Sequence, residues 1–331
     1  SADRVLGQRN FSESVNAPPL VGTEVLGLAN AASIGTLPRH IAVDPVSGRL
    51  FLADAGASRV ISWPSAAAFH NGESADVILG QPDEFTMLSP ACAGGAIDAT
   101  TLCGPYGVAT DRAGHLFVSD RGNHRVLRFV PPFSTGMAAT QVFGQGGVFD
   151  TRVENKGGIS AESLSFPGAV AAGATALFVH DAGNRRILVY PTPSLNATAG
   201  AAIGQAGLGS SETGSASATR FPASDGGLAL DAQGRLWFAE TQSNRVVRFS
   251  PPFTTNMPID LLLGQVTPDN TGAAAGSTGL STPFGIAFDR AGGLLVADAE
   301  NHRVVRYAPP FASSMAATGL VGQSTFSGTD P

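Results

Sequence analysis

The sequence predicts an all-β fold, a β-propeller built from five repeats of a four-stranded unit. First, an Arg that opens an apolar run recurs at roughly the spacing of propeller blades, every sixty residues or so. These arginines are Arg59, Arg125, Arg186, Arg245 and Arg303. Second, 41 Gly and 22 Pro residues favour many turns over long helices. Third, no segment carries the sustained apolar periodicity of an amphipathic helix, so almost no helix is expected.

Each repeat contains four short apolar runs, bounded by Gly, Asp, Asn and Pro, which are typical of strands. In the last repeat the first run is Thr282–Asp289 and the second, Gly293–Asp298, ends in an acidic residue. The third, Arg303–Tyr307, begins with the marker Arg, and the fourth, Leu320–Gln323, ends in a Gly-Gln pair. A lone four-stranded sheet leaves its faces uncovered, whereas radial packing against neighbouring sheets covers them, which favours a propeller.

We expect a single domain over residues 1–331, with repeats at about 37–81, 104–145, 166–205, 222–265 and 282–323. Residues 1–36 are expected to hold a closing strand and a linker, because Arg4–Gln8 is a further copy of the fourth run. Propellers close by letting one terminus complete the blade that the other begins, since an open edge invites aggregation. Leu320–Gln323 already completes the fifth repeat. Two alternatives therefore stay open: five blades with one extra strand, or six blades with the sixth built from both chain ends.

One string in the repeat resembles a known family. The pattern Gly-x-Leu-x-Val-(Ala/Ser)-Asp, followed by Asn-His-Arg-Val, leads into Asp120–Val126 and Asp298–Val304 and is similar to the NHL repeat. The resemblance extends over about residues 37–325, with departures at Ala57-Ser58 and Asn184-Arg185. It implies a propeller of five or six blades. It does not select a function, because this fold serves binding modules, enzymes and assembly platforms alike.

Residues that recur in nearly every repeat are interpreted as structural. Each Asp that ends a second run is expected to accept hydrogen bonds from the turn, since aspartate side chains mimic backbone there. Each marker Arg is expected to pair with an acidic group between blades. His124 and His302 share one repeated position and are expected to be structural too. Pro-Pro-Phe triplets occur at residues 131–133, 251–253 and 309–311. Their Phe is expected to pack each outer strand, the alternative being an exposed apolar belt that binds a partner.

Charge and hydropathy exclude two classes of partner. The net charge of −6 argues against a nucleic-acid binder, whose footprint is basic. The most apolar stretch, Gly168–Val179, is mostly Ala and Gly and ends at His180, so no membrane span is predicted. The remaining partner classes are a small molecule, a peptide or a protein.

The only two cysteines lie in one connector. Cys92 and Cys103 fall between Pro90 and Pro105, with a Gly-Gly pair between them. An even pair in one irregular loop indicates a small disulfide-closed loop and an oxidising compartment, so we expect a secreted or periplasmic protein. The alternative is two free buried thiols.

Function is expected where the pattern breaks, on one face of the blades. If the first strand runs away from this face, the link between the second and third strands and the connector to the next repeat both lie on it. These connectors are long, at residues 82–104, 146–166, 206–221 and 266–282. The turns on the opposite face are short, as at Asp111–Gly114. Long loops on one rim of a rigid scaffold are where ligands usually bind, the alternative being that they are only spacers. We name the two sides the long-connector face and the short-turn face.

Six residues are the candidates for binding a ligand on the long-connector face. They are Arg39, His40, Tyr106, His180, Asp225 and Phe284. His40 replaces the Gly of the motif, Asp225 sits in a two-residue insertion, and His180 replaces the usual Ala or Ser. A mixed set of this kind in the mouth of the central channel suits a polar small molecule or a peptide. The alternative is that each His only fills space beside the channel.

No catalytic residue can be assigned from the sequence. Peptidyl-hydroxyglycine lyases, which are NHL-like propellers, hold zinc with histidines immediately after the Pro of several first strands. The matching positions here are Arg39, Tyr106, Gly168, Ala223 and Phe284, none of which is His. Zinc needs three converging ligands, and His40 with His180 supplies two at most, so no metal or other cofactor is predicted. The sequence predicts a binding or scaffold module; the alternative is a hydrolase or lyase that uses Asp225 with His40 or His180 as acid and base.

Overall fold

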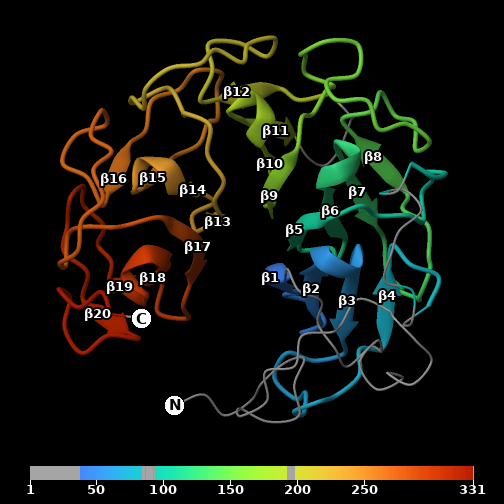
Figure 1. The fold of residues 1–331 in the computed structure, drawn as a ribbon, viewed down its shortest axis with the longest axis horizontal. Coiled ribbons are helices and arrows are strands. Elements are labelled where there is room, and N and C mark those ends of the chain that lie inside the picture. Colours follow the sequence, from blue (N-terminus) through green and yellow to red (C-terminus); the bar gives the residue numbers. More distant parts are fainter. Residues whose placement is uncertain (1–37, 84–85, 87–91, 93, 192–197, 331) are drawn as a thin grey trace. The chain divides into compact units, whose positions relative to one another are not determined.

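The computed structural model describes residues 38–83, 86, 92, 94–191 and 198–330. They form five four-stranded antiparallel sheets, each with its strands in chain order (Figure 1). Among the described residues the helical elements are short 3₁₀ turns, and none could cross a membrane. The predicted β-propeller of five four-stranded blades is therefore confirmed. The alternative sixth blade and its strand at Arg4–Gln8 lie outside the described residues.

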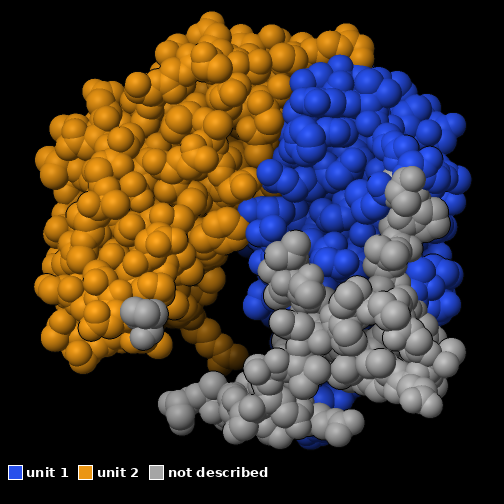
Figure 2. Space-filling model, viewed as in Figure 1, with its two compact units in different colours: residues 1–156, 162–167 blue, residues 157–161, 168–331 orange. Residues whose placement is uncertain are grey.

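The chain divides into two compact units, coloured separately in Figure 2. Unit 1, residues 1–156 and 162–167, contains blades 1 and 2. Blade 1 consists of β1 (Pro38–Val43), β2 (Leu50–Asp54), β3 (Arg59–Trp63) and β4 (Val77–Leu79). Blade 2 consists of β5 (Pro105–Thr110), β6 (Leu116–Asp120), β7 (Arg125–Phe129) and β8 (Gln141–Phe143).

Unit 2, residues 157–161 and 168–331, contains blades 3, 4 and 5. Blade 3 consists of β9 (Pro167–Ala172), which starts at the unit boundary, β10 (Ala176–Asp181), β11 (Arg186–Pro191) and β12 (Ala201–Ile203). Blade 4 consists of β13 (Leu228–Leu230), β14 (Leu236–Glu240), β15 (Arg245–Phe249) and β16 (Leu261–Leu263). Blade 5 consists of β17 (Pro283–Phe288), β18 (Leu294–Asp298), β19 (Arg303–Tyr307) and β20 (Gly319–Val321).

A single 3₁₀ turn joins the second and third strands of every blade. The turns are η1 (Ala55–Ala57), η2 (Arg121–Asn123), η3 (Ala182–Asn184), η4 (Thr241–Ser243) and η5 (Ala299–Asn301). Each is closed by a residue with left-handed backbone, for example His124 at φ 52° and Asn244 at φ 50°. Asn and His are enriched among the non-Gly residues that adopt this conformation, which fits the repeated Asn-His pattern.

Each turn brings the acidic residue and the marker Arg of one blade into a buried ion pair. The Nε–carboxylate distances are 2.9 Å for Asp54–Arg59, 2.7 Å for Asp120–Arg125, 2.7 Å for Asp181–Arg186, 2.6 Å for Glu240–Arg245 and 2.6 Å for Asp298–Arg303. The expectation that the acidic partner lies between blades is wrong. The two residues face each other in adjacent strands, as the register Asp120↔Arg125 shows. The acidic groups do accept bonds from their turns, as Asp120 does from Asn123 Nδ2 at 2.8 Å.

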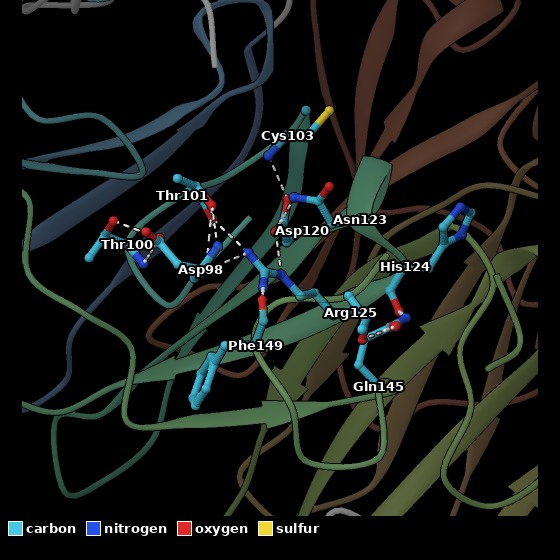
Figure 3. Close-up of polar contacts among 12 residues, drawn as sticks. Asp98, Thr100, Thr101, Cys103, Asp120, Asn123, His124, Arg125, Gln145 and Phe149 are labelled. Atoms are coloured by element: carbon cyan, nitrogen blue, oxygen red, sulfur yellow. Dashed lines mark hydrogen bonds and ion pairs between the residues drawn. The ribbon is translucent and has the colours of Figure 1, made fainter. Parts of the chain in front are cut away.

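In four blades the Nη1 and Nη2 atoms of the marker Arg bond to the flanking connectors, at Arg125, Arg186, Arg245 and Arg303. Arg125 donates through Nη2 to the carbonyl oxygens of Asp98 at 3.0 Å and Thr101 at 2.8 Å, in the preceding connector. Through Nη1 it donates to the carbonyl of Phe149, in the following connector (Figure 3). Arg245 makes the same kind of contacts with Ser217 and Pro268. One buried side chain thus fixes both long connectors that flank its blade.

The Pro-Pro-Phe triplets pack one blade on the preceding one within each unit. The half-buried rings of Phe133, Phe253 and Phe311 each contact, edge-to-face, an aromatic ring on the second strand of the preceding blade. The centroid distances are 5.0 Å to Phe51, 4.8 Å to Phe178 and 4.9 Å to Trp237, respectively. The backbone after each triplet also bonds to the outer strand of that blade, as Gly136 N does to Ile78 O at 2.9 Å. These contacts support the structural interpretation and cover the edges of the outer strands β4, β12 and β16.

The first strand of blade 4 is shorter than its repeat predicts. It begins at Leu228, three residues after Asp225. Gly226 has φ +141°, and a Cβ atom there would lie 1.7 Å from the carbonyl oxygen of Ala239. Only Gly fits this approach, so the two-residue insertion replaces the start of the strand with an irregular loop.

Candidate functional site

Three of the six candidate residues come together in unit 1. Arg39 and His40 lie on β1, Tyr106 lies on β5, and these first strands run side by side (Figure 1). The His40 and Tyr106 ring centroids are 5.3 Å apart, and Arg39 Cζ lies 5.2 Å from the Tyr106 centroid. Tyr106 is buried, His40 half-buried and Arg39 exposed. Exposure to solvent therefore increases from Tyr106 through His40 to Arg39.

Arg121 completes this set, and the sequence analysis missed it. Its Cζ lies 4.8 Å from the Tyr106 centroid, so two guanidinium groups approach one aromatic ring. Arg121 opens the turn η2, on the long-connector face. The same position in the other four turns holds Ala55, Ala182, Thr241 and Ala299. The rule that singled out His40, a break in the repeat, would have identified this Arg as well. We call Arg39, His40, Tyr106 and Arg121 the Tyr106 cluster.

A disulfide fixes the connector beside this cluster. Cys92 and Cys103 are bonded, with an S–S distance of 2.01 Å, as predicted. Cys103 N donates to Asp120 Oδ1 at 2.6 Å, and its carbonyl accepts a bond from Gly122 N at 2.9 Å. A Cβ atom at Gly122 would lie 2.5 Å from Cys103 Sγ, so only Gly lets the turn pass this close. The residue that follows Arg121 is therefore held against the disulfide.

His124, at the end of the same turn, holds the next connector. Its Nδ1 accepts a bond from Phe166 N at 3.1 Å, and its ring packs against the Phe166 ring at 4.3 Å. Burial lowers the pKa of His124; Glu154 opposes this effect and Arg121 adds to it. A neutral imidazole is the form that can accept the Phe166 bond. These contacts support the predicted structural role of His124.

The other three candidates lie in unit 2. His180, on β10, is fully buried, and its ring packs against Phe238 at a centroid distance of 4.8 Å. Asp225 is half-buried in the loop before β13, where its carbonyl accepts Ser224 Oγ at 2.8 Å. Phe284, on β17, is half-buried, and its carbonyl accepts Gly227 N at 2.7 Å. Asp225 and Phe284 thus belong to adjoining inner segments of blades 4 and 5, whereas His180 is an interior side chain. Their part in binding a ligand stays a prediction.

The Tyr106 cluster places two guanidinium groups beside one aromatic ring. Guanidinium groups present fixed arrays of donors that match carboxylates and phosphates. Nowhere in the described residues do three or more His, Cys, Asp or Glu side chains gather so as to hold a metal ion.

Comparisons with known proteins identify the repeat. The model of the NHL repeat matches residues 102–129 and 280–307, which span the first three strands of blades 2 and 5. No curated protein sequence matches this chain significantly.

Similar solved structures include two proteins of different kinds. A catalytically inactive virginiamycin B lyase from Staphylococcus aureus, solved with quinupristin, is 16% identical, with a TM-score of 0.46. The alignment covers 83% of this chain and 68% of the lyase. A nidogen/laminin complex is 15% identical, with a TM-score of 0.45, and the alignment covers 87% of this chain and 86% of that one. The function of this chain is therefore argued from its own side chains.

Proposed function

We propose that this NHL-repeat propeller is a binding module whose Tyr106 cluster takes the acidic group of a small molecule or peptide. The observation that carries the proposal is the approach of Arg39 and Arg121 to a single ring, at 5.2 and 4.8 Å. Both guanidinium groups lie beside the same ring, and each presents N–H donors that match a carboxylate or a phosphate. The half-buried His40 ring adds an aromatic surface for the rest of the ligand.

The surroundings of the cluster support a preformed site. Arg121 lies on a turn whose neighbours are fixed by the Cys92–Cys103 disulfide and by the Asp120–Arg125 ion pair. A binding group held by rigid elements loses little entropy when the ligand arrives, which favours affinity. The disulfide also supports a protein that works outside the reducing cytoplasm, so we propose a secreted or periplasmic module.

The test uses Arg121→Ala, which introduces the residue found at this position in three other turns. An array of peptides that carry Asp or Glu, with free or amidated C-termini, is screened against the parent protein. Each binder is then titrated calorimetrically against Arg121→Ala and against Arg112→Ala, a control that removes an exposed Arg from the short turn of blade 2.

We expect Arg121→Ala to weaken binding about fivefold, the range of one partly exposed ion pair, and Arg112→Ala to leave it unchanged. The proposal fails if no acidic peptide binds the parent. It also fails if every binder has the same affinity for both variants.

A further inference from the structure

Unit 2 contains a concave site on the short-turn face. A cavity of about 740 Å³ opens between blades 4 and 5. It is bounded by the turn Asp231–Gln233 of blade 4, the turn Asp289–Gly292 of blade 5 and Pro309–Phe311. Its volume falls in the range of small-molecule sites.

Aromatic rings form the base of this cavity. Phe288 and Phe311 line it, with centroids 6.3 Å apart in an edge-to-face arrangement. Behind them Trp237, which is fully buried, contacts Phe288 at 5.7 Å and Phe311 at 4.9 Å. Three mutually packed rings present a rigid apolar surface that suits a flat ring or an alicyclic body.

The charged groups around the base leave one cation in excess. Three ion pairs surround the aromatic base: Arg235–Asp231 at 2.6 Å, Arg248–Asp260 at 2.5 Å and Arg306–Asp289 at 2.6 Å. Arg290, an exposed residue that lines the cavity, makes no ion pair with any residue that the structure describes. Since three pairs cancel and Arg290 does not, the cavity carries a local positive charge in a protein whose net charge is −6.

The corresponding turn of blade 2, in unit 1, has closer neighbours. A Cβ atom built on Gly114 would lie 3.6 Å from Asp44 Oδ2 and 3.7 Å from Pro131 Cγ. At Gly292, the corresponding turn position of blade 5, nothing lies within 4 Å of such an atom. The next residue differs as well, because His115 of blade 2 is replaced by Gly293 in blade 5. The surroundings of these two turns therefore differ between blade 2 and blade 5.

We propose that this cavity binds an organic acid with an aromatic or alicyclic body. The ring lies against Phe288 and Phe311, and the carboxylate lies beside Arg290. This site is independent of the Tyr106 cluster, since it lies in the other unit and on the other face of the blades.

Naphthoate and its uncharged analogue naphthylmethanol are the probes for this site. Both are titrated calorimetrically into the parent protein and into Arg290→Ala and Ala291→Trp. The repeat supplies matched controls in Arg112→Ala and Ala113→Trp, which make the same changes in the corresponding turn of blade 2. All four positions are exposed, so the substitutions leave the interior untouched.

We expect the parent to bind naphthoate about fivefold more tightly than naphthylmethanol, as one partly exposed ion pair allows. Arg290→Ala removes this preference, Ala291→Trp fills the cavity and weakens both probes, and the two controls behave like the parent.

The proposal is overturned if naphthoate does not bind at millimolar concentrations, or if Ala291→Trp binds it as the parent does. It is also overturned if binding is lost in Arg121→Ala instead, since naphthoate then occupies the Tyr106 cluster.

Discussion

Removing one marker Arg tests the role of the buried ion pairs. In the parent, Arg125 bonds to Asp120 and to three connector carbonyls, and both charged side chains are fully buried. Arg125→Ala leaves the Asp120 carboxylate buried without its counter-ion, a change that costs about 3–5 kcal/mol in comparable buried pairs. We therefore expect the free energy of unfolding to fall by about 4 kcal/mol and the midpoint of thermal unfolding to fall by about 10 °C.

The loss of stability caused by Arg125→Ala should depend on pH. Burial raises the pKa of the Asp120 carboxyl, while Arg125 opposes that rise. Without Arg125 the pKa rises further above its unfolded value, so the folded variant takes up a proton more readily than the unfolded chain. Stability of the variant relative to the parent therefore recovers as the pH falls from neutral to about 5.

The assay is urea and thermal unfolding followed by circular dichroism, at pH 7 and at about pH 5. Arg128→Ala is the control, because this neighbouring Arg on β7 is only half-buried and bonds to Gln141 and His115. Its loss should cost less than about 1 kcal/mol. If Arg125→Ala unfolds within that same range of the parent, the buried pairs do not stabilise the blades as argued.

Two further predictions concern the same unit. Thiol titration of the denatured, unreduced protein should find almost no free thiol. Replacing Cys92 and Cys103 by Ser should lower the free energy of unfolding by about 3 kcal/mol, because the two cysteines are 11 residues apart and their bridge closes a short loop. Two titratable thiols would contradict the bridge. Because burial lowers the pKa of His124, the unfolded chain binds more protons below the ordinary value of 6.5, and stability decreases as the pH falls through and below that value. His124→Asn should weaken this dependence in pH-dependent urea unfolding, since Asn244 Oδ1 makes the same bond to Thr282 N at 2.7 Å. An unchanged pH profile would show that His124 does not cause it.

The strands were predictable because each is specified more than once. Three signals agree in every repeat: the apolar runs, the turn residues around them and the repetition of both. A strand that is ambiguous in one repeat is therefore identified from the others. The position of the ion pair could also have been predicted from the sequence. Asp120 and Arg125 flank a tight turn, and such residues face each other across antiparallel strands, which places the pair inside one blade.

Contacts between blades were not predictable from the sequence, since the strands that meet are far apart along the chain. Nothing in the residues near Tyr106 indicates that Arg39 and Arg121 both approach its ring. His180 illustrates the converse. Its position in other blades holds small residues that are buried or half-buried, namely Ala53, Ser119, Ala239 and Ala297. A His there enters the core and packs against Phe238.

Residues that follow the repeat and residues that break it should respond differently to substitution. Arg125 follows the repeat, and its guanidinium group is used entirely in contacts that hold the blade and its connectors. Arg121 breaks the repeat, and three other turns fold with Ala in its place. Since Ala is compatible with this turn, Arg121→Ala should lower ligand affinity while leaving the free energy of unfolding near that of the parent. Arg125→Ala should instead lower the free energy of unfolding, because each of the five repeats keeps its marker Arg.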